Sequence, residues 1–308
     1  MKSIENIRIL VVGDIMLDKY TRGEVGRISP EAPVPIVNVT DEYSELGGCG
    51  NVTRNICELG AQVDCLASIG HDGYGDIISL ELDKIGAKNL LIRSSEKTTV
   101  KERFIANHRH VQMLRVDRES TKVVSCIDAI NNLTKKGYDK YDMVVVSDYA
   151  KGMISMPLMS FLKNQQSARI IVDPKPQQGA MYNDVHMITP NEKEWASMQV
   201  TSNYVLDKVS HVLITKGKRG MTLMKAETNE WWDIPAEPVE IYNVSGAGDT
   251  VIAIMAVCLS MGYNELNAAY VANKCAGYVV TQTGTSVVPK NKFTQIILEH
   301  KNEDMSNV

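Results

Sequence analysis

The chain has 308 residues and a formal net charge of −4, with 44% hydrophobic and 23% charged residues, values typical of a globular protein. Its basic residues are scattered, which gives no sign of a nucleic-acid surface. No uncharged apolar run reaches the roughly 20 residues that cross a bilayer. The short apolar run near the amino terminus is followed at once by Asp14, which favours a buried strand over a secretory signal. We expect a cytoplasmic protein with neither membrane nor nucleic-acid partners, made of one large or two modest domains.

The cysteines show no metal-binding spacing. None forms a CxxC pair, and most lie in apolar stretches, so we expect buried free thiols in a reducing compartment and no structural zinc site. The six are Cys49, Cys57, Cys65, Cys126, Cys258 and Cys275.

Strand and helix patterns alternate along most of the chain. The first strand is "IRILVVG" (7–13), whose continuous apolar run is typical of a strand buried on both faces. Helical spacing over 51–61 ends at Gly60, 63–70 is the next strand, and 75–85 is a helix closed by Gly86. Further strands are expected at 143–148, 168–174, 185–189 and 211–215. This alternation predicts an α/β fold with a doubly wound, mostly parallel sheet flanked by helices.

Two segments break the alternation. Residues 21–45 contain three prolines and alternating apolar residues, and residues 98–117 alternate in a strand-like way but are rich in charge. We expect them to form a small subsidiary sheet, at about 20–45 and 98–118, inserted in a single domain spanning 1–308. The last eight residues are expected to fray.

The stretch "YNVSGAGDT" (242–250) places two glycines and a carboxylate directly before an apolar run. Gly246 and Gly248 allow a tight turn and close approach of a ligand. The N–H groups of Ala247, Gly248 and Asp249 would then open a helix, whose amino terminus favours an anion such as a phosphoryl group. The alternative is an ordinary helix start with a glycine turn.

Three other stretches fall at strand ends, where open α/β sheets bind ligands. "TPNEKEW" (189–195) spaces Asn191 and Glu194 three apart, which taken alone is a capping box. "TKGKRG" (215–220) taken alone is a hairpin turn, and "LGGCGNVTRN" (46–55) puts paired glycines and Asn51 at a helix start. No GxxxxGK[ST] phosphate loop occurs, and the first strand lacks the GxGxxG of a dinucleotide site, which disfavours an oxidoreductase.

Over nearly its full length the sequence resembles the ribokinase-type (PfkB) carbohydrate kinases. The matching stretches are "GDIMLD", "GGCGNVTRN", "PNEKE", "TKGKRG" and "NVSGAGD", in the family's order and spacing. The resemblance implies a ribokinase-like fold and a kinase that uses ATP and Mg²⁺. Within the family, "GDIMLDKY", "RISPEAPVPIV" and "SDYAKG" resemble the branch that phosphorylates D-glycero-D-manno-heptose 7-phosphate at its anomeric hydroxyl, in ADP-heptose biosynthesis.

The resemblance also implies roles for individual residues. Asp249 would be the base that accepts the proton of the sugar hydroxyl, and the amides of Gly246, Ala247 and Gly248 would form the anion hole. Asn191 and Glu194 would position Mg²⁺, largely through water. The nucleotide side would comprise Thr215, Lys216, Gly217, Gly220 and Asn273, with Lys175 near the donor phosphates. An exposed polar helix residue is the alternative for Asn273.

On the sugar side the resemblance implies Asp14, Asp18, Gly47, Gly48 and Asn51. A substrate that already carries a phosphate at its far end needs cations, for which Lys101 and Arg103 are the candidates. A turn residue is the alternative for Asp18, and a solvated charged face is the alternative for the two cations.

The subsidiary strands would form the family's lid, which excludes water from the sugar and in many relatives pairs two subunits, so we expect a homodimer. Asn243 stands where the family usually has the aspartate of DxxGAGD, so we expect only a weak site for a monovalent cation; Ser245 replaces the common threonine, with little expected effect. Because no HxGH-type nucleotidyltransferase signature is present, we expect the kinase step only. Two alternatives stay open: a PfkB-type kinase of another sugar, sugar phosphate or nucleoside, and a catalytically silent regulator on the same scaffold.

Overall fold

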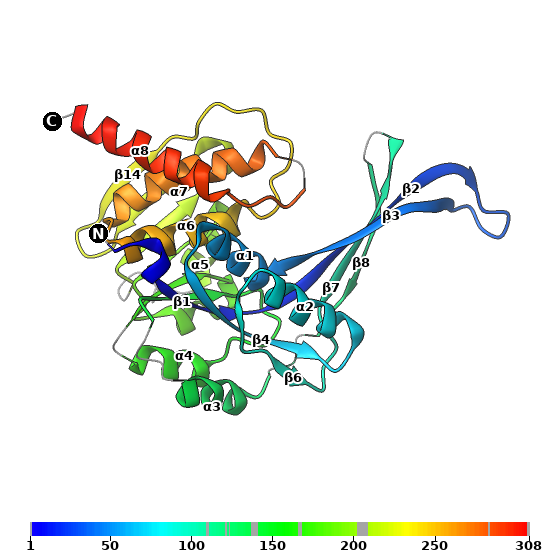
Figure 1. Cartoon of the computed structure of the whole chain (residues 1–308), viewed down its shortest axis with the longest axis horizontal. Coiled ribbons are helices and arrows are strands. Elements are labelled where there is room, and N and C mark those ends of the chain that lie inside the picture. Colours follow the sequence, from blue (N-terminus) through cyan, green and yellow to red (C-terminus); the bar gives the residue numbers. More distant parts are fainter. Residues whose placement is uncertain are drawn as a thin grey trace.

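The computed structural model describes residues 2–108, 111–120, 122, 124–136, 141–165, 168–201, 209–282 and 284–306. The chain forms a layered body with one arm of β-strands that extends away from it (Figure 1). The body contains a ten-stranded sheet, and the arm is a separate four-stranded sheet.

The large sheet has the order β14-β13-β12-β11-β10-β9-β1-β4-β5, with β6 paired to β4. Pairing is parallel from β12 through β9 and β1 to β4, while β13 and β14 add an antiparallel edge. The strands are β1 (Arg8–Gly13), β4 (Gln62–Gly70), β5 (Lys88–Asn89), β6 (Ile92–Ser94), β9 (Met143–Ser147), β10 (Arg169–Asp173), β11 (Met187–Ile188), β12 (His211–Thr215), β13 (Met221–Lys225) and β14 (Glu230–Ile234). The predicted α/β class and the strands expected from 7–13 to 211–215 are confirmed.

Helices cover both faces of this sheet. Alternate residues of β1 show why: Ile9 and Val11 belong to one apolar core and Leu10 and Val12 to the other, and all four are fully buried. The first core is closed by α1 (Cys49–Leu59), α2 (Gly73–Lys84), α6 (Ala247–Met261), α7 (Glu265–Val280) and α8 (Lys290–Ser306). The second is closed by α3 (Cys126–Lys136), α4 (Met156–Asn164) and α5 (Glu192–Thr201). Short 3₁₀ helices occupy Ile4–Asn6, Pro176–Tyr182 and Gly217–Arg219.

Local sequence accounts for the helix ends. Gly60, which follows α1, has φ 96°, a left-handed conformation that glycine adopts without strain. The carboxylate of Asp72 accepts a hydrogen bond from the Gly75 amide and caps α2, which is why this helix starts before the predicted 75. The "TKGKRG" stretch is the turn of the antiparallel β12–β13 hairpin.

The small sheet has the order β3-β2-β7-β8. Its strands are β2 (Ile15–Ile28), β3 (Pro35–Gly48), β7 (Val100–Ala106) and β8 (Val111–Arg118), so it includes both segments that break the alternation. β2 starts at the body and runs outward, and β3 returns to the body, so the two strands form a long hairpin (Figure 1).

Four of the six cysteines are buried, whereas Cys57 and Cys126 are only partly buried, so the expectation of buried thiols was wrong for these two. Of the described residues, none forms a helix both long and apolar enough to cross a bilayer.

Candidate active site

A cavity of about 240 Å³ lies at the carboxyl ends of the parallel strands. It is lined by residues at or just after the carboxyl ends of four neighbouring strands, together with the start of α6: Tyr149, Asp173, Lys175, Thr189, Asn191, Glu194, Thr215, Gly246, Gly248 and Asp249. The structure thus brings together the predicted catalytic residues, the predicted Mg²⁺ residues and part of the predicted nucleotide loop.

The start of α6 is shaped by two glycines. Gly246 has φ 79°, and a Cβ there would lie 2.8 Å from the Asn51 side chain. Gly248 faces open space, and the first amides of a helix have no partner within the helix. The Ala247 amide, one of three predicted for the anion hole, instead donates to the Val244 carbonyl at 3.3 Å. The remaining amides of this turn present a partial positive charge to the cavity.

Asp249 is the buried carboxylate at this helix start, with a relative exposure of 6%. One oxygen accepts a hydrogen bond from the Asn51 amide at 2.8 Å, and the other accepts one from the Tyr149 hydroxyl at 3.0 Å. Burial raises the pKa of Asp249 to about 6, although the two hydrogen bonds lower it. A carboxylate with a pKa this close to neutral is a better proton acceptor than an ordinary aspartate.

Tyr149 is a site residue that the sequence did not single out. Two ammonium groups lie near its ring, with Lys101 Nζ 5.4 Å and Lys175 Nζ 5.2 Å from the ring centroid. Burial raises its pKa well above the usual value, so the hydroxyl stays protonated and donates to Asp249. The one available signal was its place inside "SDYAKG".

Asn191 and Glu194 form the capping box of α5. The Glu194 amide donates to Asn191 Oδ1 and the Asn191 amide to Glu194 Oε2, both at 3.0 Å. The other Glu194 oxygen pairs with Lys175 Nζ at 2.6 Å. The two side chains therefore form the capping box that was the alternative to a metal role, and both residues also line the cavity.

Asp173 is a second carboxylate that the sequence did not single out. Burial, and next the charge of Asp249, raise its pKa well above the usual value. Asp173, Glu194 and Asp249 thus crowd negative charge around one cavity, with Lys175 as a nearby cation. Since Mg²⁺ prefers oxygen ligands and relieves such repulsion, this donor set fits Mg²⁺.

The predicted nucleotide residues converge on the β12–β13 turn and the segment after β14. Thr215 bridges to Asn191, and Lys216 Nζ lies 3.3 Å from Asp233. Gly217 (φ 56°) faces open space, whereas Gly220 has φ 87° and a Cβ there would collide with the Ile234 carbonyl. Asn273 is buried and donates to the Pro235 carbonyl at 2.7 Å, so the alternative of an exposed helix residue was wrong.

The predicted sugar residues lie at the root of the arm. Asp18 forms an ion pair with Arg103 at 2.5 Å, so two groups expected to bind different parts of the substrate bind each other here. Lys101 lies near both and also near Lys151, and burial lowers its pKa. Gly47 packs against the Asp18 carboxylate, where a Cβ would collide with it. Gly48 has φ 58°, and its position against the Asp14 carbonyl also excludes a side chain.

Asp14 has a structural role that its sequence position did not suggest. Its carboxylate accepts hydrogen bonds from the amides of Tyr149, Lys151 and Met153 at 2.8 to 3.0 Å. β1 and β9 are neighbours from which the chain continues in opposite directions along the sheet, the place where such sheets form ligand crevices. Asp14 therefore fixes the loop that carries Tyr149.

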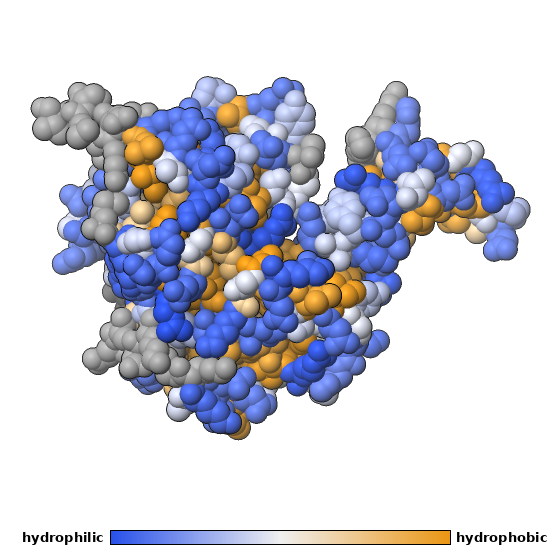
Figure 2. Space-filling view, viewed as in Figure 1, coloured by the Kyte–Doolittle hydropathy of each residue, from blue (hydrophilic) through white to orange (hydrophobic). Residues whose placement is uncertain are grey.

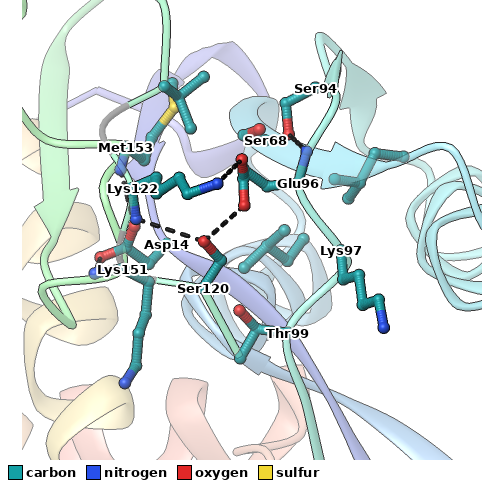
Figure 3. Close-up of a pocket in the computed structure, with 13 residues that line it drawn as sticks. Asp14, Ser68, Ser94, Glu96, Lys97, Thr99, Ser120, Lys122, Lys151 and Met153 are labelled. Carbon is teal, nitrogen blue, oxygen red and sulfur yellow. Dashed lines mark hydrogen bonds and ion pairs between the residues drawn. The ribbon is translucent and has the colours of Figure 1, made fainter. Parts of the chain in front are cut away.

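A smaller polar pocket has Asp14 in its lining (Figure 3). Inside it, Glu96 accepts hydrogen bonds from Ser120 at 2.8 Å and from Lys122 at 3.1 Å. Its volume of about 30 Å³ suits one or two water molecules and not a sugar.

The loop before α6 is held by Asn243. Its side-chain nitrogen donates to the Gly284 carbonyl and its oxygen accepts from the Ser245 amide, both at 2.9 Å. An aspartate could not make the first of these bonds, because it lacks the donor.

Comparison with known proteins gives one consistent result. Residues 6–291 match the pfkB family carbohydrate kinase. The chain is 38% identical to the bifunctional protein HldE of Desulfatibacillum aliphaticivorans, over 91% of this chain and 61% of that protein. It is also 38% identical to the protein of that name from Rhodospirillum rubrum, over 93% and 61%. The chain thus spans less than two thirds of the length of these relatives.

Solved structures share the fold at low identity. Phosphofructokinase-2 from Escherichia coli, in complex with potassium, superposes with a TM-score of 0.76 at 17% identity, over 96% of this chain and 99% of that one. Ribokinase from Giardia lamblia superposes with a TM-score of 0.74 at 17% identity, over 95% and 99%. The ribokinase-like fold is therefore confirmed.

Proposed function

The chain belongs to the pfkB family of carbohydrate kinases, and from that premise we propose that it transfers a phosphoryl group from ATP to the anomeric hydroxyl of D-glycero-D-manno-heptose 7-phosphate. As a member of this family it is a sugar kinase, a phosphotransferase. The observation that carries the chemistry is the buried Asp249 carboxylate, with a pKa of about 6, facing the cavity at the start of α6.

In the proposed reaction Asp249 accepts the proton of the sugar hydroxyl as the hydroxyl oxygen bonds to the γ-phosphorus. The bond from that phosphorus to the bridging oxygen breaks, and ADP leaves. Asn51 and Tyr149 hold both oxygens of Asp249, which fixes the direction in which the base points. The open amides at the start of α6 stabilise the charge on the transferred group, and because the transition state is loose, positioning contributes most of the catalysis.

Lys175 would contact the donor phosphates; the support is that it lines the same cavity as Asp249 and Gly248. Asp173 and Glu194 are the residues that would hold Mg²⁺, which when bound neutralises phosphate charge. The nucleotide base would lie beside Gly220 and the segment that Asn273 holds.

The heptose phosphate is supported by the three stretches that resemble that branch of the family and by the charges at the root of the arm. Arg103 pairs with Asp18 there, and Lys101 lies close enough to Asp18, Arg103 and Lys151 to feel their charges. In the proposed complex the distal phosphate replaces Asp18 as the partner of Arg103, and the freed Asp18 carboxylate binds sugar hydroxyls.

A coupled ADP-release assay tests the proposal with heptose 7-phosphate, fructose 6-phosphate, ribose and adenosine as acceptors. We expect turnover on the heptose phosphate alone, and a loss of about 10²–10⁴-fold in Asp249→Asn. Asp64→Asn is the matched control, because Asp64 is also buried and accepts a tyrosine hydroxyl but lies outside the cavity. Turnover on another acceptor would keep the kinase and discard the heptose; no turnover on any would favour the silent regulator.

We also propose that two copies pair through the arm. Figure 2 shows apolar side chains along the side of the arm formed by β2 and β3. The exposed apolar residues of the arm are Ile28, Val34, Val39, Val111, Met113 and Leu114, each at least 41% exposed. A second copy of this chain is the occupant that brings an identical apolar surface to this one.

Sedimentation analysis tests this pairing. Val39→Glu should turn a dimer into a monomer, whereas Val200→Glu, at an 87% exposed position of α5 on the body, should not. A wild-type monomer at micromolar concentration, or a dimer that survives Val39→Glu together with Leu114→Glu, would contradict the pairing.

A further inference from the structure

A cluster of two histidines and a glutamate lies away from the catalytic cavity. His186 directly precedes β11, His211 is the first residue of β12, and Glu265 is the first residue of α7. The His211 amide donates to the His186 carbonyl at 3.0 Å, which places the two imidazoles on neighbouring strands. These positions are at the amino ends of the parallel strands, whereas the cavity is at their carboxyl ends. The cluster and the cavity therefore lie at opposite ends of the strands.

The three side chains converge. His186 Nε2 lies 3.0 Å from Glu265 Oε1, and the two imidazole centroids are 5.4 Å apart. One potential ligand atom from each residue lies within 4.8 Å of the other two. Ligands of a tetrahedral zinc ion, at about 2.0–2.1 Å from the metal, are about 3.4 Å apart. Side-chain rotations that shorten the longest separation by up to about 1.4 Å would therefore complete the geometry.

One ring nitrogen of this cluster is unsatisfied. His211 Nδ1 is buried and forms no hydrogen bond within the part of the chain that the structure describes. A buried polar atom without a partner is costly, and in proteins such an atom commonly binds an ion or a water molecule.

The surrounding charges are mixed. Glu265 supplies a carboxylate oxygen that lies 3.0 Å from His186 Nε2. Arg169 Nη1 lies 3.5 Å from Glu265 Oε1, and Lys225 is paired with His211 across the β12–β13 hairpin. These two positive charges repel a divalent cation. A metal site here therefore requires coordinate bonds to nitrogen, because charge attraction alone would not hold the ion.

We propose that His186, His211 and Glu265 bind one divalent transition-metal ion, with Zn²⁺ as the preferred ion, at a site separate from the kinase centre. Imidazole and carboxylate ligands together suit Zn²⁺, whereas Mg²⁺ prefers an all-oxygen shell. The ion would join the starts of β11, β12 and α7 and so stabilise the body of the protein against unfolding.

Titration of metal-free protein with Zn²⁺ tests the site, in excess Mg²⁺ to occupy the carboxylates of the cavity. The background is Cys57→Ser with Cys126→Ser, which removes the two partly exposed thiols. We expect one Zn²⁺ per chain, a higher melting temperature with the ion, and visible absorption bands when Co²⁺ replaces it. His211→Ala should weaken binding at least tenfold, and His71→Ala, at an exposed histidine, should leave it unchanged.

Equal Zn²⁺ affinity in wild type and His211→Ala, or no binding by the wild type, would overturn the proposal. If His211→Ala fails to fold, His186→Gln provides the same comparison. Anomalous scattering at the zinc edge would give the position directly, and an ion found anywhere but between these three side chains would also overturn it.

Discussion

Replacing Tyr149 by phenylalanine isolates one hydrogen bond to the base. The change removes the hydroxyl that donates to Asp249 at 3.0 Å and keeps the ring that Lys101 and Lys175 contact. A hydrogen bond to a charged group contributes about 1.5–3 kcal/mol, and one pH unit of pKa corresponds to about 1.4 kcal/mol. Because the lost bond stabilises the ionised form, the pKa of Asp249 should rise from about 6 by about one to two pH units.

The assay is the pH profile of kcat/KM. Since the ionised carboxylate is the active form, its acid limb should move to higher pH in Tyr149→Phe. Activity should fall about 5- to 50-fold at pH 6 and less than about twofold at pH 9. Tyr141→Phe is the control, because that hydroxyl also donates to a buried aspartate, Asp64 at 2.8 Å, far from the cavity. An unmoved acid limb in Tyr149→Phe, or an equal movement in Tyr141→Phe, would refute the reasoning.

Three further predictions concern stability and ion dependence. Asp249→Asn should unfold at a higher temperature than the wild type at pH 8 but not at pH 3.5. Because folding raises the pKa of Asp249 from 3.8 to about 6, the ionised carboxylate destabilises the folded state by up to about 3 kcal/mol above pH 6. Calorimetry that finds no higher melting temperature at pH 8 would contradict this. Gly220→Ala should lower the free energy of unfolding in urea by about 1–3 kcal/mol and raise KM for ATP, because position 220 has φ 87° against the Ile234 carbonyl; an unchanged urea midpoint would count against it. Rates should be nearly equal in K⁺, Na⁺ and choline salts, because Asn243 is uncharged and already bound to Gly284 and Ser245; strong activation by K⁺ would show this to be wrong.

The sequence predicted those features that depend on neighbours in the chain. The buried strand at 7–13, the helix after Gly246 and the turn at 215–220 each carry their own pattern, and each is present. The edge strands β13 and β14 were missed, because "MTLMK" and "EWWDI" show no clear alternation of apolar and polar residues. The two strands pair with each other as an antiparallel hairpin.

The site was harder to predict where distant segments meet. Asp14 was expected to bind sugar, but the three amides that it accepts from belong to a loop more than 130 residues later. Arg103 was expected to meet a phosphate, and its pairing with Asp18 depends on the parallel register of β2 and β7. Tyr149 was not singled out, since only the folded chain shows that its hydroxyl reaches Asp249.

The long hairpin of the arm has a mechanical consequence. β2 runs for 14 residues from Ile15 to Ile28, about 46 Å of continuous strand at 3.3 Å per residue. Asp18 lies near the inner end of β2 and the exposed Ile28 near its outer end. A small rotation of the hairpin at its root would therefore produce a large displacement at its tip. In a pair of copies joined through the arm, as proposed, a contact at the tip would therefore also restrain the root of the arm, where Asp18 and Arg103 lie.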